Sequence, residues 1–286
     1  MVKNNSSRLL LICFLLLSLS ACSSRLIYNN LDWLTYWYLD DYIELTDEQE
    51  ERFDPMLNRF LTWHRESQLQ QYSQLLQRIK KDVNDGIKEQ DIADYMVTVK
   101  LAWKDILIRL EPDLVDLSFT LSDQQLNQFL QESENYNLDK IAEQQSLNHQ
   151  QRLDKRLKMI TKRIESYTGK LSEPQKALLK HSNNNVISTF DDWIIYRRAW
   201  AESIRSAFDL RSNKAKFETQ ISSSILHTDR LRSEIFWKKI EYNQQLWIET
   251  MVQLVNSLST KQRNALNDKL DSLIDDLQTL SSYSKK

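Results

Sequence analysis

Apolar side chains recur every three or four residues along most of the chain, which is the spacing of one face of an α-helix. The stretch 47–84 shows the pattern, with one predicted face that carries Phe53, Leu57, Phe60, His64, Tyr72, Leu75, Ile79 and Val83. No stretch longer than a few residues alternates apolar and polar positions as a half-buried strand would. The pattern therefore predicts an all-α protein.

The limits of the periodic stretches predict a series of helices. We expect them at residues 31–43, 47–84, 89–110, 113–119, 123–134, 138–167, 173–211, 214–226, 229–257 and 260–280. The longer ones would extend roughly 40–55 Å at about 1.5 Å per residue, so the expected fold is an elongated bundle of long amphipathic helices. No linker rich in Pro, Gly or Ser interrupts residues 31–286, which we expect to form a single domain.

Glycine and proline are rare, and their positions predict helix ends. The chain of 286 residues has two glycines and three prolines, too few for strands joined by tight turns. Gly86 and Gly169 each follow a long periodic stretch, where a C-terminal cap requires a positive φ. Pro112 suits the first turn of a helix. Pro55 lies nine residues beyond Thr46, inside an expected helix, and should kink or divide that helix.

The N-terminus has the pattern of a secretory signal peptide. Lys3 and Arg8 precede an apolar run that ends at Leu19, and small residues follow. The run is shorter than the roughly 20 residues that a membrane-spanning helix requires. We therefore expect residues 1–21 to be a signal peptide that is removed, and residues 22–30 to form a short tether.

The sequence Leu-Ser-Ala-Cys at 19–22 resembles the bacterial lipobox. The resemblance implies cleavage before Cys22, an S-diacylglycerol on its thiol and an acylated amine. Such chains hold a protein on a membrane without a spanning helix. Ser23 stands where an inner-membrane retention signal usually has Asp, which implies the periplasmic face of the outer membrane. The alternative is an ordinary signal peptide with an incidental cysteine.

A pentapeptide occurs four times, as LTDEQ at 45–49, LSDQQ at 121–125, LSEPQ at 171–175 and LSTKQ at 258–262. A Ser or Thr followed three residues later by Gln is the spacing of a capping box. In that arrangement the hydroxyl accepts from the third helical amide, and the Gln side chain accepts from the amide of the cap residue. We expect the repeats to be helix starts, with N-caps at Thr46, Ser122, Ser172 and Ser259.

Two resemblances add to this interpretation. The pentapeptide resembles the LTxxQ motif of the Spy/CpxP periplasmic chaperones, which are all-helical and shield unfolded chains. A wider resemblance is to a family of Gram-negative lipoproteins that is known only as a domain of unknown function. It rests on the lipobox and on the motifs YNN-x-DW, DDY-x-x-LT-x-x-Q and WH, which follow in residues 22–66. The wider resemblance implies an envelope location and a helical fold, and it implies no activity.

Trp33 and Trp37 are four residues apart and share one face of the first expected helix. That face either lies among lipid headgroups, where Trp and Tyr gather, or packs on the bundle. Asp32 and the acidic residues that follow at 40, 41 and 44 favour packing, because they would oppose an anionic surface.

The remaining residues predict no catalytic, nucleotide or metal site. Four histidines at 64, 149, 181 and 227 stand outside any HExxH or CxxC context. Two glycines cannot supply a phosphate-binding loop, so no cofactor is expected. Lys and Arg number 38 against 40 Asp and Glu, which argues against nucleic acid as a partner.

Together these patterns predict a lipid-anchored protein on the periplasmic face of the outer membrane. We expect it not to be an enzyme, and to bind a protein partner in the envelope. The alternatives are a chaperone-like binder of unfolded periplasmic proteins, a structural spacer, or an enzyme assembled from dispersed carboxylates.

Overall fold

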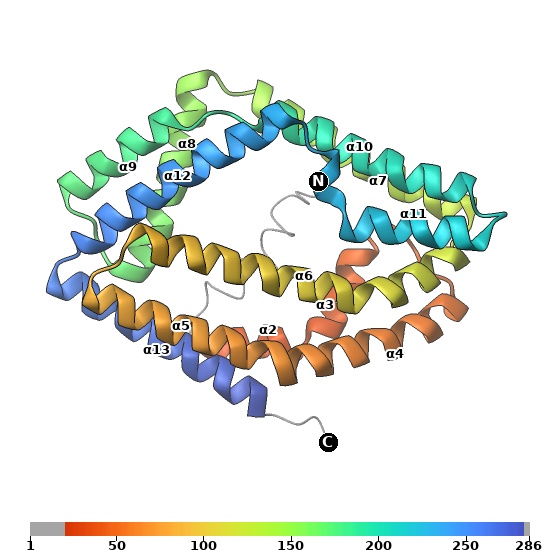
Figure 1. The fold of residues 1–286 in the computed structure, drawn as a ribbon, viewed down its shortest axis with the longest axis horizontal. Helices are drawn as coiled ribbons and strands as arrows, with labels where there is room; N and C mark the ends of the chain where they lie inside the picture. The colour runs from red at the N-terminus through yellow and green to blue at the C-terminus, as the bar shows by residue number, and fades with distance from the viewer. Residues whose placement is uncertain (1–20, 283–286) are drawn as a thin grey trace. The chain divides into compact units, whose positions relative to one another are not determined.

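The structure is a computed structural model that describes residues 21–282 (Figure 1). All the regular elements in this range are helical, so the all-α prediction is confirmed. The α-helices are α2 (Ala21–Asn29), α3 (Leu31–Leu39), α4 (Asp47–Trp63), α5 (Leu69–Asp85), α6 (Glu89–Thr120), α7 (Asp123–Gln145), α8 (His149–Thr168), α9 (Glu173–Asn185), α10 (Phe190–Asp209), α11 (Lys214–Leu226), α12 (Glu234–Asn256) and α13 (Thr260–Ser282). A π-helix at His64–Gln68 joins α4 to α5, and a 3₁₀-helix at Thr228–Leu231 precedes α12.

The predicted signal peptide lies outside the described residues, apart from its last residue, Ala21. The predicted tether is helical from its first residue to Asn29, and Tyr28 within it is only 3% exposed. Asn30, the last residue of the predicted range, lies between α2 and α3. The role of residues 22–30 as a tether stays a prediction.

Pro55, which was expected to kink or divide a helix, and Pro112, which was expected in a first helical turn, both lie inside helices. α4 runs through Pro55 and α6 runs through Pro112. A proline deprives the carbonyl four residues earlier of its helical donor. The residues concerned are Glu51 and Ile108, both exposed, so water can satisfy those carbonyls. The expected helices 89–110 and 113–119 are consequently one helix.

Two other predicted helix boundaries differ from those in the structure. The expected helix 173–211 is divided between α9 and α10 by the extended residues 186–189, and Val186 at the C-cap has φ −65° and ψ 125°. The expected boundary near residue 134 is absent, because α7 continues to Gln145. The helical spacing of apolar residues continues across residues 186–189, so the sequence pattern did not indicate the break between α9 and α10.

The chain divides into two compact units, each built from three separate stretches. Among the described residues the first unit holds 21–68, 102–142 and 190–233, and the second holds 69–101, 143–189 and 234–282. The expectation that residues 31–286 form one domain stays a prediction.

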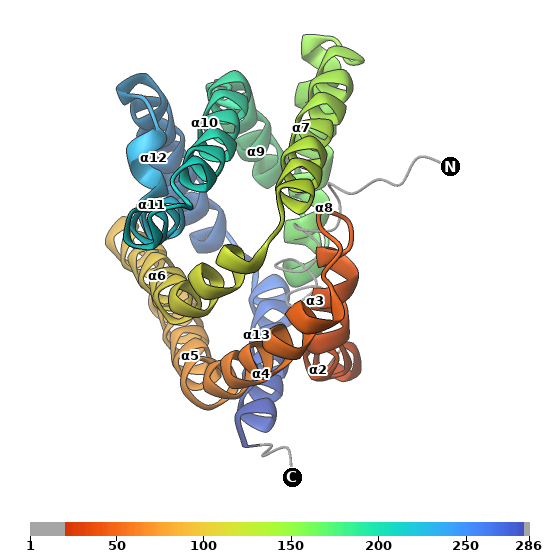
Figure 2. The same ribbon diagram turned by 90° about the vertical axis from the view of Figure 1, so that its right-hand side faces the viewer.

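The first unit has a core of apolar side chains from α6, α7, α10 and α11. Phe217 is fully buried, and the rings of Phe119 and Phe208 meet it edge-on, each with a centroid separation of 5.3 Å. α10 and α11 lie side by side (Figures 1 and 2). A second cluster of Phe53, Met56 and Leu57 on α4 receives Tyr36 and Leu39 from α3. This second cluster holds the N-terminal helices on the unit.

The second unit has a core around Leu171, Leu179 and Leu254, from the loop before α9, from α9 and from α12. α5 and α13 lie side by side in it (Figure 1). Lys80 on α5 pairs with Asp271 on α13 at 2.5 Å, and the Arg263 guanidinium donates to the carbonyl of Val83. These contacts join the C-terminal helix to α5 by polar as well as apolar packing.

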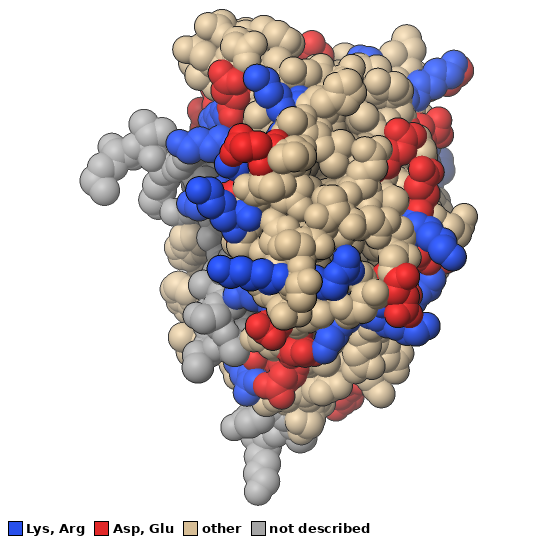
Figure 3. Space-filling view, turned by 90° about the vertical axis from the view of Figure 1, so that its left-hand side faces the viewer, with Lys and Arg blue, Asp and Glu red and all other residues tan. Residues whose placement is uncertain are grey.

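No helix within the described range is long and apolar enough to cross a membrane. On the face shown in Figure 3, basic and acidic side chains are interspersed, in keeping with a formal net charge of −2.

Candidate functional site

All four predicted N-cap residues stand at helix starts in the structure. The Thr46 hydroxyl accepts from the Gln49 amide at 3.4 Å, and Gln49 Oε1 accepts from the Thr46 amide at 3.0 Å. The same two bonds join Ser122 to Gln125 at 3.2 and 2.9 Å. They also occur at Ser172 with Gln175 and at Ser259 with Gln262. Each repeat therefore satisfies two amide groups that a bare helix start leaves unpaired.

The glutamines of the first two repeats also bind each other. Nε2 of Gln49 donates to Oε1 of Gln125 at 3.1 Å, and Nε2 of Gln125 donates to Oε1 of Gln49 at 2.6 Å. Each Nε2 also donates to the carbonyl just before the other repeat, that of Thr120 at 3.0 Å and that of Glu44 at 2.8 Å. We call this arrangement a glutamine junction. It joins the start of α4 to the start of α7 in the first unit.

The second unit contains a junction of the same kind between the starts of α9 and α13. Nε2 of Gln175 donates to Oε1 of Gln262 at 3.1 Å, and the reverse bond measures 2.9 Å. The carbonyls bound here belong to Ser257 and Lys170, which again immediately precede the two repeats. The four repeats therefore act as two pairs, one pair in each unit.

The side chains of the two glutamine junctions are neutral amides, which hold helices together and are not reactive groups. Each Oε1 accepts from its own cap and from the partner glutamine, so the amide orientation is fixed by backbone groups. The four glutamines are between 4% and 9% exposed. A buried, fully paired amide network specifies which helix starts meet. Thr46 and Gln49 are thus occupied by contacts within the protein.

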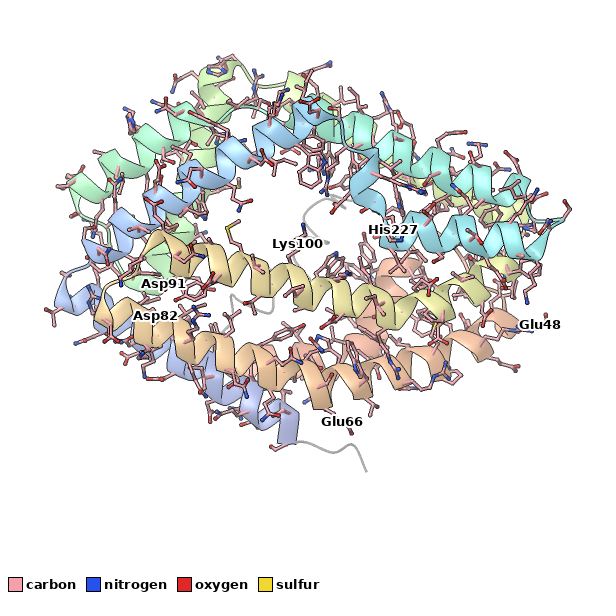
Figure 4. All side chains as sticks on the ribbon, viewed as in Figure 1. Glu48, Glu66, Asp82, Asp91, Lys100 and His227 are labelled. Carbon is pink, nitrogen blue, oxygen red and sulfur yellow. The ribbon has the colours of Figure 1, made fainter. Side chains whose placement is uncertain are left out.

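A cavity of about 580 Å³ opens beside the first junction. Its lining comes from the starts of α4 and α7 and includes Glu44, Glu48, Arg52, Gln124 and Gln128. Glu48 projects outward at the start of α4 (Figure 4). The lining is polar and offers charged side chains of both signs.

His64 begins the π-helix and is enclosed by residues of α2. Its Nδ1 lies 2.8 Å from the Tyr28 hydroxyl, and the two rings stack with centroids 5.9 Å apart. The neighbouring Arg65 lies over the Tyr28 ring at 4.8 Å and donates to the side chain of Asn29 at 3.0 Å. Burial, together with the charge of Arg65, lowers the pKa of His64 to about 4. The imidazole is therefore neutral near pH 7, as in a packed histidine.

The π-helix turns His64 and Arg65 toward α2, while Glu66 points outward (Figure 4). Such widened turns insert an extra residue into the helical register and recur at functional sites. Here the altered register places His64 against Tyr28, and this contact holds α2 on the rest of the first unit.

The other three histidines, His149, His181 and His227, are exposed. The described part of the chain holds no group of three or more His, Cys, Asp or Glu residues placed to bind a metal.

Trp33 and Trp37 project from α3 and do not enter the core. Trp33 is 63% exposed and Trp37 is 37% exposed, and their rings stack with centroids 6.4 Å apart. α3 packs through Tyr36 instead, whose ring meets Phe53 edge-on at 5.2 Å. The tryptophan face and the packing face of α3 are thus different faces.

The first half of α6 carries an apolar surface that the sequence pattern did not single out. Within six consecutive residues of the second unit, Met96, Val97, Val99 and Leu101 are 36%, 56%, 58% and 56% exposed. Lys100 lies among them and projects from α6 on the side away from α5 (Figure 4). Helical periodicity places apolar residues on α6 but cannot tell which of them a neighbouring helix covers. We call these four apolar residues with Lys100 the α6 surface.

Comparison with known proteins identifies the family of the chain and no activity. No curated protein and no solved structure shows significant similarity to it. One family, described as "Family of unknown function (DUF6279)", matches residues 41–239. The matched range begins after the YNN and DW elements at 28–33 and includes the first three pentapeptides. Because the match covers more than half of the chain, the chain belongs to this DUF6279 family of unknown function.

Proposed function

We propose that this protein is a lipid-anchored module on the periplasmic face of the outer membrane, and that it binds another envelope protein without catalysing a reaction. The observation that carries the binding role is the α6 surface. Four large apolar side chains within six residues are exposed there. Exposed apolar side chains that gather on one segment of a folded protein favour a role in protein–protein contact.

The α6 surface favours a particular kind of partner. Val97 and Leu101 are four residues apart and share one helix face, and Lys100 adds a positive charge beside them. The complementary partner is a protein segment that presents apolar side chains together with a carboxylate. Burial of such side chains contributes roughly 25 cal/mol per Å² of apolar area, while the ion pair chiefly aids specificity.

The envelope location is supported by the resemblance of residues 19–22 to a lipobox and by the basic and apolar residues before them. The acyl chains on Cys22 would supply the membrane affinity. Replacement Cys22→Ala tests the anchor: we expect the protein to leave the membrane fraction. Continued tight association of the variant with membranes would refute lipid anchoring.

Photo-crosslinking in cells tests the binding role. A photoreactive amino acid at Val97 or at Leu101 should give one dominant adduct of defined mass, identified by mass spectrometry. The matched control is the same residue at Lys158, which is exposed on α8 of the same unit. Equal yields from all three positions, or no adduct from α6, would overturn the proposed partner site.

The same experiment separates a specific partner from a chaperone role. The exposed apolar side chains of α6 would also suit unfolded chains, which bind through apolar segments of varied sequence. A broad ladder of adducts, together with suppressed aggregation of unrelated proteins in vitro, would favour the chaperone. A single adduct without such suppression would favour one envelope partner.

A further inference from the structure

We propose that Trp33 and Trp37 form a second membrane contact, in which the exposed face of α3 lies among the headgroups of a zwitterionic phospholipid bilayer. This inference rests on the proposed lipid anchor at Cys22. It adds a defined orientation of the first unit on the membrane, which an acyl anchor alone does not provide.

The two indoles form a fixed apolar platform. They stack with an interplanar angle of 16° and are 63% and 37% exposed. Leu26 on α2, which is 65% exposed, adds a further exposed apolar side chain near the N-terminus. Trp prefers membrane–water interfaces because its ring is apolar while its N–H donates a hydrogen bond. A pair of outward indoles therefore suits the headgroup region.

α3 is held rigidly enough to present this platform. Tyr36 packs edge-on against Phe53 and donates its hydroxyl to Asp54 Oδ1 at 2.6 Å. Leu39 packs on the same cluster of α4. These contacts occupy the face of α3 that carries Tyr36, so Trp33 and Trp37 are left facing outward.

The position of Cys22 in the sequence is the reason to expect a membrane against the exposed face of α3. Leu26 is the fourth residue after Cys22, which limits their Cα separation to about 14 Å even in an extended chain. Trp33 is the eleventh residue after Cys22, roughly 17 Å away at the rise of a helix. α2 is in turn fixed by the Tyr28–His64 contact at 2.8 Å. An acylated Cys22 would therefore bring α3 to the bilayer surface.

The acidic residues near α3 do not oppose this arrangement. The Asp32 carboxylate is half-buried and accepts from the backbone amide of Trp33 at 2.9 Å. Asp40 and Asp41 lie beyond Leu39, where α3 ends. A zwitterionic surface, unlike an anionic one, does not repel the remaining negative charge. The favoured occupant is therefore a bilayer with little net charge.

Fluorescence quenching by lipid tests the contact. The full lipidated chain is reconstituted into phosphatidylcholine vesicles whose acyl chains carry bromine at a shallow position. The protein has eight tryptophans, so the readout is the difference between wild type and the double variant Trp33→Phe/Trp37→Phe. Because Phe preserves the apolar surface, the variant removes the reporter and retains the contact. We expect the quenched fraction to fall roughly twofold or more.

The controls separate this inference from the anchor. Trp247→Phe removes an indole of similar exposure, 38%, and should leave the lipid-dependent quenching unchanged. Equal quenching in wild type and double variant, with Cys22 shown by mass spectrometry to be lipidated, would overturn the α3 contact alone. An unmodified Cys22 in protein from membranes would overturn the anchor and, with it, this inference. If lipid quenching is equal in the two forms and the emission of Trp33 and Trp37 shifts when another protein is added, the exposed face of α3 binds protein instead.

Discussion

Gln49 and Gln125 exchange two hydrogen bonds across the starts of α4 and α7, at 3.1 and 2.6 Å. Each glutamine uses its oxygen for its own helix and for its partner, and its nitrogen for its partner and for the carbonyl that precedes the partner's repeat. The bonds close a symmetrical network in which every polar atom of the two amides is paired. A local capping motif thereby becomes a long-range contact.

Removal of one glutamine should destabilise the first unit strongly. Gln49→Ala leaves the Thr46 amide, the Thr120 carbonyl and the Gln125 side chain short of partners, and each buried unpaired group costs about 1–3 kcal/mol. We expect a loss of roughly 3 kcal/mol in the free energy of unfolding, measured by urea denaturation. Gln124→Ala removes an exposed neighbour and should change it by less than about 0.5 kcal/mol.

A double-mutant cycle makes that prediction specific. Gln49→Ala combined with Gln125→Ala should destabilise by about 1–2 kcal/mol less than the sum of the single changes, because the second substitution removes a group that the first has already left unpaired. Strict additivity would show that the two side chains act as independent caps.

The junction in the second unit should respond to charge. Gln175→Glu retains an acceptor for the Ser172 amide but replaces the donor to Ser257 and Gln262. Burial at 4% exposure should raise the pKa of the new carboxyl above its unfolded value of about 4.3. The unfolded state then binds fewer protons than the folded state, so stability should fall as pH rises from 5 to 7.5. Urea unfolding of variant and wild type at the two pH values measures this, because the difference between the two proteins cancels the contribution of His64. A variant whose loss of stability relative to wild type is no larger at pH 7.5 than at pH 5 contradicts the prediction.

The helical fold was predictable because the apolar period and the residue composition report the local preference for helix, and most of this chain has that preference. The positions where helices break were not predictable, because they depend on which residues are exposed to solvent in the folded protein. Pro55 and Pro112 are tolerated in positions where the residues whose carbonyls lose a donor, Glu51 and Ile108, are exposed to solvent. Conversely, residues 186–189 leave the helix although neither Gly nor Pro occurs there.

The N-cap residues were predictable for the same reason, because a capping box is complete within four residues. The glutamine junctions were not, because the second role of each Gln depends on which helix starts meet. An even number of near-identical repeats was the only signal. For Trp33 and Trp37 the i, i+4 spacing identified a shared face but not its environment, since the neighbouring Tyr36 supplies the packing.

His64 should make stability dependent on pH below neutrality. Its pKa is about 4 in the folded protein and about 6.5 in the unfolded chain, so unfolding takes up a proton between these values. The stabilisation is fully present above pH 6.5 and is lost as the pH falls toward 4. We expect wild type to lose about 2–3 kcal/mol more than His64→Gln between pH 7.5 and 4.5 in urea unfolding. Parallel losses in the two proteins would show that carboxylates account for the acid sensitivity.

Gly169 should resist substitution for a reason that involves the backbone alone. Its φ of 74° and ψ of −173° fall in a region that is essentially restricted to glycine. A Cβ there would meet no atom within 4 Å, so Gly169→Ala adds strain without a clash. We expect a loss of about 1–3 kcal/mol in the free energy of unfolding, with no relief from Gly169→Asn, because asparagine tolerates the left-handed helical region and not this one.

The turn at Gly169 also positions the second glutamine junction. The next residue, Lys170, offers the carbonyl that Gln262 binds at 3.0 Å. If Gly169→Ala moves that carbonyl, its effect and that of Gln262→Ala should be less than additive, because both break the same bond. Lys170→Ala keeps the carbonyl and removes only an exposed side chain, so it should leave stability nearly unchanged. Additive losses from Gly169→Ala and Gln262→Ala would show that the turn and the junction are energetically independent.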